Sequence, residues 1–171
     1  MIYPIVKLGD PVLEKRAEPV SLFDDELKKL VDDMFESMYA AHGVGLAAPQ
    51  IGISKRLAVI DVTFKEDPDA KLVLANPEII HTEGRHSQNE GCLSIPDFRE
   101  AVTRARKVTI RAQDVNGHFY EKTGEELLAR AVRNGDGQTL FDLFTRTRAI
   151  RRAIIDIGQD TAAPDFGRNK T

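Results

Sequence analysis

The sequence predicts a single α+β domain with a mainly antiparallel sheet. Three observations carry this prediction: a chain of 171 residues, one clear helical repeat of apolar residues and a series of short strand-like segments. The length suits one domain with one sizeable core. The strand-like segments follow one another between two predicted helices, whereas strands that alternate with helices would indicate a parallel sheet.

The first helix is predicted over residues 22–41. Ser21 is the expected N-cap, the acidic run Asp24–Glu26 suits the positive end of the helix dipole, and Gly43 is expected to end the helix. The apolar residues recur at helical spacing and form one face to be buried: Leu27, Leu30, Val31, Met34, Phe35, Met38 and Tyr39.

Strands are predicted over residues 56–62, 71–74, 78–83 and 107–113. Asn116-Gly117 predicts a hairpin turn, because both residues accept positive φ angles, and residues 118–122 form the expected return strand. Thr123 is then the expected cap of a second helix, predicted over residues 124–132.

Composition and charge exclude several classes of protein. A net charge of −3 gives no reason to expect binding to nucleic acid or to an anionic membrane. The apolar runs stay below the roughly 18 residues that a membrane span needs, and we expect no signal peptide at the start of the sequence. A single cysteine, Cys92, excludes an internal disulfide, so we expect a cytoplasmic protein.

The first segment that could carry chemistry is Gly43-Val44-Gly45-Leu46-Ala47-Ala48-Pro49-Gln50. Its small residues let another backbone approach closely, as a bound peptide would, and its closing glutamine has an amide that can donate to a carbonyl oxygen. The same composition also suits a turn that ends the helix and packs against the core. Composition alone favours that plainer interpretation.

The second segment is Glu90-Gly91-Cys92-Leu93-Ser94-Ile95-Pro96. The cysteine follows a glycine, and the proline keeps the segment from being a central strand, which suits a thiolate at the edge of a site. A lone cysteine is more often a small buried apolar residue, and the segment taken alone favours that interpretation.

Together the two segments, with about forty residues between them, resemble the first two signature motifs of peptide deformylases. The resemblance extends from Ile5 to Val132 and includes the opening run Leu8–Leu13 and the run Glu125–Val132. It implies an α+β fold in which the antiparallel sheet packs around a central helix. It also implies a metal-dependent enzyme that removes the formyl group from the N-terminal formylmethionine of nascent proteins.

The resemblance assigns roles to individual residues. Cys92 would be a metal ligand as its thiolate, and the Leu93 backbone N–H and the Gln50 side-chain amide would form an oxyanion hole for the formyl oxygen. Three residues would bind the substrate: Val44, Gly45 and Gly91. The implied metal is iron(II), with zinc, nickel or cobalt as substitutes. The implied partners are N-formylmethionyl peptides.

The third motif of the family, H-E-x-x-H on a helix, is missing. Asn134 and Gln138 stand where its histidines belong, and Gly135 stands where its glutamate belongs. No pair of the four histidines has ligand spacing on a helix: His42, His81, His86 and His118. One thiolate cannot replace three protein ligands, so we expect the sequence as written to bind no catalytic metal and to be inactive or impaired.

Two explanations of the missing motif stay open, a true pseudoenzyme and a shifted reading frame near Val132. Read from the second base of each codon, residues 134–139 permit the pattern Glu-x-Asp-x-Leu, which the family has within its third motif, and we favour the frame shift. Two further alternatives are a non-catalytic protein that still binds N-terminal peptides and a chain that cannot fold stably.

We therefore divide the chain into a peptide deformylase-like domain over residues 1–132 and a divergent C-terminal segment over residues 133–171. A helix is expected over 140–157 and disorder over 160–171. In some family members a C-terminal helix contacts the ribosome. The basic residues of this segment allow the same interpretation. The plainer interpretation is that they form a solvated face, or that the sequence of this segment was never selected to fold. Those residues are Arg146, Arg148, Arg151 and Arg152.

Overall fold

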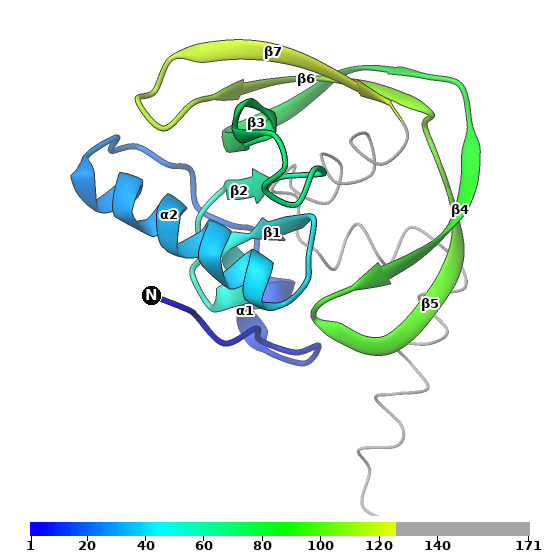
Figure 1. Ribbon diagram of the computed structural model, residues 1–171, viewed down its shortest axis with the longest axis horizontal. Coiled ribbons are helices and arrows are strands. Elements are labelled where there is room, and N and C mark those ends of the chain that lie inside the picture. Colours follow the sequence, from blue (N-terminus) through cyan, green and yellow to red (C-terminus); the bar gives the residue numbers. More distant parts are fainter. Residues whose placement is uncertain (126–171) are drawn as a thin grey trace, which may run out of the picture.

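The computed structural model describes residues 1–125 as two antiparallel sheets and one long helix (Figure 1). The larger sheet has the strand order β1-β2-β3-β6-β7, and the smaller sheet is the hairpin β4–β5, part of which is described by its backbone alone. The predicted α+β class with a mainly antiparallel sheet is confirmed. The elements are α1 (Pro11–Glu14), α2 (Asp25–Ala40), β1 (Gly45–Ala47), η1 (Ala48–Ile51), β2 (Leu57–Ile60), η2 (Pro68–Ala70), β3 (Leu72–Glu83), β4 (His86–Cys92), β5 (Ile95–Arg104), β6 (Lys107–Gln113) and β7 (Phe119–Glu125).

Helix α2 confirms the predicted first helix, but its two ends differ from the prediction. Asp24, and not Ser21, is the N-cap: its carboxylate accepts the Leu27 N–H at 2.9 Å. At the other end Gly43 was expected to end the helix, but the residue that takes the left-handed conformation there is His42, with φ 54°. The Gly43 N–H then donates to the Met38 carbonyl at 2.9 Å, as in a Schellman motif.

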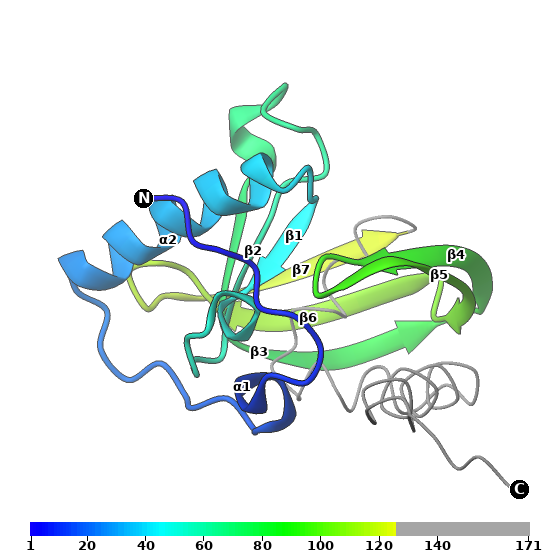
Figure 2. The same ribbon diagram turned by 90° about the horizontal axis from the view of Figure 1, so that it is seen from below.

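The five-stranded sheet has a buried core on each face, and Figure 2 shows α2 lying across one of them. All four residues of β2 are buried, and they alternate between the faces as the strand period requires. On the α2 side the buried residues include Val31, Met34, Met38, Leu57 and Val59. On the opposite side they include Leu13 of α1, Ala58, Ile60, Leu74 and Ile110.

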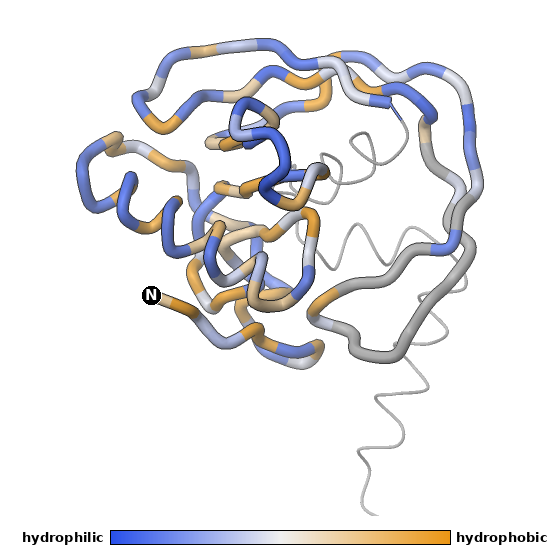
Figure 3. The backbone as a smooth tube through the Cα atoms, in the orientation of Figure 1, coloured by the Kyte–Doolittle hydropathy of each residue, from blue (hydrophilic) through white to orange (hydrophobic). Residues whose placement is uncertain are grey.

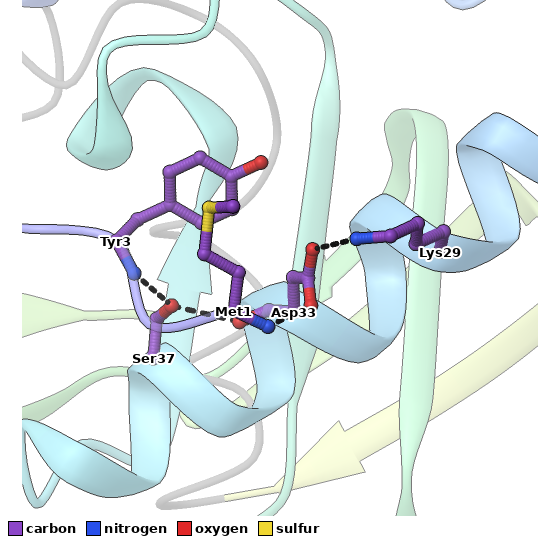
Figure 4. A network of polar contacts seen from close by, with 5 residues as sticks. All are labelled: Met1, Tyr3, Lys29, Asp33 and Ser37. Carbon is purple, nitrogen blue, oxygen red and sulfur yellow. Dashed lines mark hydrogen bonds and ion pairs between the residues drawn. The ribbon is translucent and has the colours of Figure 1, made fainter.

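The first residues of the chain are tied to α2 by a network of polar contacts (Figure 4). The Tyr3 N–H donates to Ser37 Oγ at 2.8 Å, and that hydroxyl donates to the Asp33 carbonyl at 2.7 Å. The Asp33 carboxylate forms ion pairs with the Lys29 ammonium, at 2.8 Å, and with the amino group of Met1. These contacts lay the N-terminal segment along the helix.

Strand β3 joins two segments that were predicted as separate strands. The pair Asn76-Pro77 interrupts the strand-like pattern and suggested two strands. In the structure the strand continues through this pair, with a register shift between Ala75 and Glu78. The Asn76 side chain supports this irregular point, because its amide accepts the Val20 N–H and donates to the Val20 carbonyl, each at 2.8 Å. The prediction of two strands was therefore wrong.

The hairpin between β6 and β7 confirms the predicted turn at Asn116-Gly117, although only Gly117 has a positive φ, of 86°. The Asp114 carboxylate holds the turn by accepting the N–H groups of Asn116 and His118 at 2.8 and 2.9 Å. Figure 3 shows hydrophobic and hydrophilic residues alternating along β6, as expected for a strand with one buried face.

The second helix was predicted to begin at residue 124, with Thr123 as its cap, and this start is wrong. Strand β7 continues to Glu125, with Thr109 opposite Thr123 and Val108 opposite Gly124. Cross-strand pairing therefore outweighs the capping preference of threonine. The rest of that helix, the helix expected over 140–157 and the expected disorder all lie outside the described residues. No helix within residues 1–125 is long and apolar enough to cross a membrane.

Candidate functional site

The fold brings the two candidate segments together. In the first segment, Gly43 and Val44 precede β1, and residues 45–50 form β1 and the first three residues of η1. In the second segment, Leu93 and Ser94 form the turn between β4 and β5. The Leu93 side chain lies so close to Gly43 that a Cβ added there would be 2.9 Å from Leu93 Cδ1. Gly43 is buried, so the absence of a side chain is what allows this approach.

Gln50 is buried, and its side chain is held by contacts at both ends of the amide. Its Oε1 accepts the Ala47 N–H at 2.9 Å, and its Nε2 lies 3.5 Å from Ser94 Oγ. Because the oxygen is fixed by Ala47, the amide nitrogen is directed toward the Leu93–Ser94 turn. The amide is therefore fixed at the point where η1 meets the tip of the β4–β5 hairpin.

The N-terminal segment joins both halves of the site. The Val6 N–H donates to the Gln50 carbonyl at 2.9 Å, which fixes the segment to η1. The Leu8 N–H donates to the Ser94 carbonyl at 2.9 Å, and Lys7 Nζ donates to the Leu93 carbonyl at 3.0 Å. The same short segment therefore holds η1 and the tip of the β4–β5 hairpin in one arrangement.

Strand β1 is the end strand of the five-stranded sheet, and its outer edge pairs with no strand in the part of the chain that the structure describes. Its inner edge pairs with β2, with Gly45 opposite Ile60. The Asp61 N–H also donates to the Val44 carbonyl at 3.0 Å, so the ladder begins just before Gly45. An open edge of this kind can accept an extended peptide.

Asp61 follows β2 beside this ladder and is fully buried. Burial disfavours its charged form, but hydrogen bonds from the Tyr39 hydroxyl and from the Thr63 and Lys65 groups outweigh burial and lower the pKa of Asp61 to about 2. The carboxylate therefore stays ionised at neutral pH, and its partners fix the loop that follows β2.

The remaining predicted site residues lie at the closed end of the β4–β5 hairpin. Gly91 stands opposite Arg99 and Cys92 opposite Ile95, with a register shift between the two pairs. Their backbones are thus next to Leu93 in the same tip.

Sequence reasoning missed Ser94 and the N-terminal donors, because a serine inside a motif and a lysine near the start of a chain give no signal of their own. Only the long-range contacts identify them.

A catalytic metal site needs three protein ligands that lie close together. Within the described part of the chain, no cluster of three or more His, Cys, Asp or Glu side chains could hold one. His86 is six residues before Cys92 on the same strand, which separates their Cα atoms by about 20 Å. His42 is exposed at the end of α2, and His118 is exposed beside the β6–β7 turn. The sequence beyond residue 125 contains no histidine or cysteine.

Comparisons with known proteins agree with the motifs. A family model described as "Polypeptide deformylase" matches residues 2–135. A peptide deformylase of Acidobacterium capsulatum is 66% identical over 156 residues, which are 91% of this chain and 92% of the relative.

Two solved structures show the same fold. A peptide deformylase from Legionella pneumophila matches with a TM-score of 0.79 and 40% identity, covering 96% of this chain and 99% of that chain. A class I type b peptide deformylase from Acinetobacter baumannii, in a structure with Met-Ala-Ser bound, matches with a TM-score of 0.73 and 32% identity, covering 80% of this chain and 94% of that chain. The chain therefore belongs to the polypeptide deformylase family.

Proposed function

We propose that this protein is a peptide deformylase that acts on the N-terminal formylmethionine of nascent proteins in the cytoplasm, and that its activity is impaired in the sequence as written. The observation that carries the proposal is the contact between the Gln50 amide and the Leu93–Ser94 turn beside the open edge of β1. A formylated peptide laid along that edge would bring its formyl oxygen to these donors. The Acinetobacter baumannii relative with Met-Ala-Ser bound supports a peptide as the ligand.

Each residue has a distinct part in the proposed site. Val44 and Gly45 would pair with the substrate backbone, with Gly91 on the facing hairpin. The Leu93 N–H and the Gln50 amide would donate to the formyl oxygen, where negative charge develops during hydrolysis. Fixed donors at such a position typically lower the barrier by about 3–4 kcal/mol each. By its resemblance to the family, Cys92 would be a metal ligand. The two histidines that complete the metal site in the family are missing from this sequence, which has Asn134 and Gln138 in their places.

The impairment has one cause, which is the loss of the third motif at residues 134–138. A frame shift near Val132 that continued to the end of the chain would make everything after it unrelated to the family. The match with the Acidobacterium capsulatum relative spans 156 of 171 residues, so it must continue well past residue 132. This continuation favours a change confined to the motif over a persistent frame shift.

The proposal predicts that the chain as written has negligible deformylase activity and that restoring the motif recovers it. The restored variant carries Asn134→His, Gly135→Glu and Gln138→His. Hydrolysis of formyl-Met-Ala-Ser and metal content would be measured on anaerobically purified protein. We expect the restored variant to bind about one metal ion per chain and to be faster by about a thousandfold or more, because catalytic groups act as a unit.

The matched control is the restored variant with Cys92→Ala added. It should lose both the metal and the activity, since Cys92 would supply the ligand that the new histidines do not. One tightly bound metal ion in the unmodified chain, together with formyl-Met-Ala-Ser turnover, would contradict the predicted impairment. It would mean that ligands other than the expected ones complete the site.

A further inference from the structure

The backbone of β1 shows which of its groups a bound peptide can use. In the peptide unit between Val44 and Gly45, the carbonyl oxygen accepts the Asp61 N–H at 3.0 Å and so points toward β2. A trans peptide unit directs its N–H opposite to its carbonyl. The Gly45 N–H therefore points to the outer edge of the sheet, where a substrate would lie.

The next outward N–H along β1 belongs to Ala47, because alternate residues of an antiparallel strand face the same side. This N–H is already taken, since it donates to Gln50 Oε1 at 2.9 Å. Both residues are buried, with Ala47 8% and Gln50 6% exposed. After Ala47 the chain leaves the strand and enters η1, whose second residue, Pro49, has no N–H to offer. The usable edge thus ends at Gly45.

We propose that the carboxamide oxygen of Gln50 ends the ladder that β1 offers to a peptide, and so makes the site specific for the N-terminal end of a chain. This inference rests on the proposed function, in which β1 pairs with the substrate. A peptide antiparallel to β1 runs with its N-terminus toward Gln50. A residue located two positions before the one paired with Gly45 would need the Ala47 N–H, and it finds that group occupied.

One orientation of the Gln50 amide both occupies the Ala47 N–H and directs the amide nitrogen toward the hairpin tip. When Oε1 accepts the Ala47 N–H, Nε2 is turned toward Ser94 and the hairpin tip. The side chain that ends the ladder thus also places its donor immediately beyond the last paired residue, where the formyl group of a chain end would be. An internal segment of a protein would place further backbone at that point, and it would meet the Gln50 side chain and η1.

The test compares the binding of two peptides to the full chain by titration calorimetry. One is formyl-Met-Ala-Ser, and the other is acetyl-Ala-Ala-Met-Ala-Ser, which adds two residues before the methionine. We expect the unmodified protein to bind the extended peptide at least about tenfold more weakly. Gln50→Ala frees the Ala47 N–H and should reduce this preference to less than about threefold. Gln50→Glu keeps an acceptor for Ala47 but loses the donor to the formyl oxygen, so it should weaken the binding of formyl-Met-Ala-Ser and still retain a preference of more than about threefold.

Amide hydrogen exchange at Ala47 gives a second readout that does not depend on substrate. The N–H should be protected in the unmodified protein and in Gln50→Glu, and it should exchange faster in Gln50→Ala. Binding of formyl-Met-Ala-Ser with the same peptide preference in all three proteins would overturn the inference and leave the proposed function standing. Failure of the unmodified protein and of both variants to bind either peptide would overturn the proposed function, and the inference with it.

Discussion

The carboxylate of Asp61 accepts four hydrogen bonds although the residue is fully buried. The donors are the Tyr39 hydroxyl at 2.6 Å, the Thr63 hydroxyl at 2.7 Å, the Thr63 N–H at 2.8 Å and the Lys65 N–H at 2.9 Å. The loop that they hold contains Phe64 and Lys65, whose φ angles of 53° and 75° are unfavourable for residues with a side chain. The buried carboxylate therefore stabilises a strained loop beside the site.

Asp61→Asn is predicted to destabilise the protein at neutral pH. The pKa of Asp61 is lowered from 3.8 to about 2, so the ionised form favours the folded state by about 2–3 kcal/mol. A lowered pKa contributes stability above the unfolded value of 3.8, and this contribution is lost as the pH falls toward 2. The difference in unfolding free energy between the two proteins should therefore be largest near pH 7 and shrink below pH 4.

Urea unfolding at a series of pH values measures this difference. Asp67→Asn is the matched control, because Asp67 lies in the same loop but is exposed, and its carboxylate accepts the Asp69 N–H. That substitution should change the unfolding free energy by no more than about 0.5 kcal/mol. A difference between Asp61→Asn and the unmodified protein that stayed constant down to pH 2 would show that the ionised carboxylate is not the cause.

The residues of the site differ in how far the sequence could identify them. Gln50 and Leu93 stand in segments whose spacing is specific, so the resemblance was enough to name them as candidates before the contact between Gln50 and Ser94 was known. Ser94 is nearly fully buried beside Gln50, yet serine is usually exposed and nothing local marks it. Lys7 and Leu8 reach the hairpin tip across more than eighty residues of sequence. Contacts of that range depend on the whole fold.

At the scale of an element, the end of α2 gives a second stability prediction. His42 has a φ of 54°, a conformation that costs about 1 kcal/mol for a residue with a Cβ and nothing for glycine. His42→Gly should therefore raise the free energy of unfolding by about 1 kcal/mol. His42→Val should lower it by a similar amount, because a β-branched residue fits this region worse. Thermal unfolding of the three proteins measures both effects.

The His42 side chain is exposed, so neither change removes a buried contact. A rise in stability for both variants, or for neither, would show that backbone strain at this position does not limit the helix end. A titration of formyl-Met-Ala-Ser serves as the control, since an exposed side chain at the helix end should not affect peptide affinity.

The elements were predictable where a local pattern decides the structure and failed where a distant partner does. The seven apolar positions of α2 identified the helix, because a buried face repeats within the sequence itself. Its N-cap was misplaced since Ser21 and Asp24 are both good caps, and only the hydrogen bond to Leu27 distinguishes them. Thr123 looks like a cap from its neighbours, but pairing with Thr109 keeps it in a strand.

At the scale of the whole molecule, the site depends on three parts of the chain that meet only in the folded protein. Each part forms one side of the candidate site: the end strand β1, the tip of the β4–β5 hairpin and the N-terminal segment. The hairpin forms a sheet of its own, so its tip is positioned by the contacts of Leu93, Ser94 and Leu8, and not by pairing with the larger sheet. Site geometry and global stability are therefore coupled.

If site geometry depends on global stability, the buried cores on the two faces of the five-stranded sheet must unfold together. Met34 and Ile110 are both fully buried, on opposite faces. Met34→Ala and Ile110→Ala should each lower the unfolding free energy by about 2–5 kcal/mol, because each leaves a cavity in a packed core. Ile80→Ala is the matched control, since Ile80 lies on β3 but is 44% exposed, and it should cost about 1 kcal/mol or less.

Urea unfolding followed by circular dichroism and by tyrosine fluorescence measures these effects, since the chain has three tyrosines and no tryptophan. If the sheet is one cooperative unit, both probes give the same midpoint in every variant. A separate, weaker transition in Ile110→Ala would mean that the face opposite α2 is packed independently. Because β2 contributes to both faces, we expect one transition, so that damage to either face would loosen β1 and its open edge.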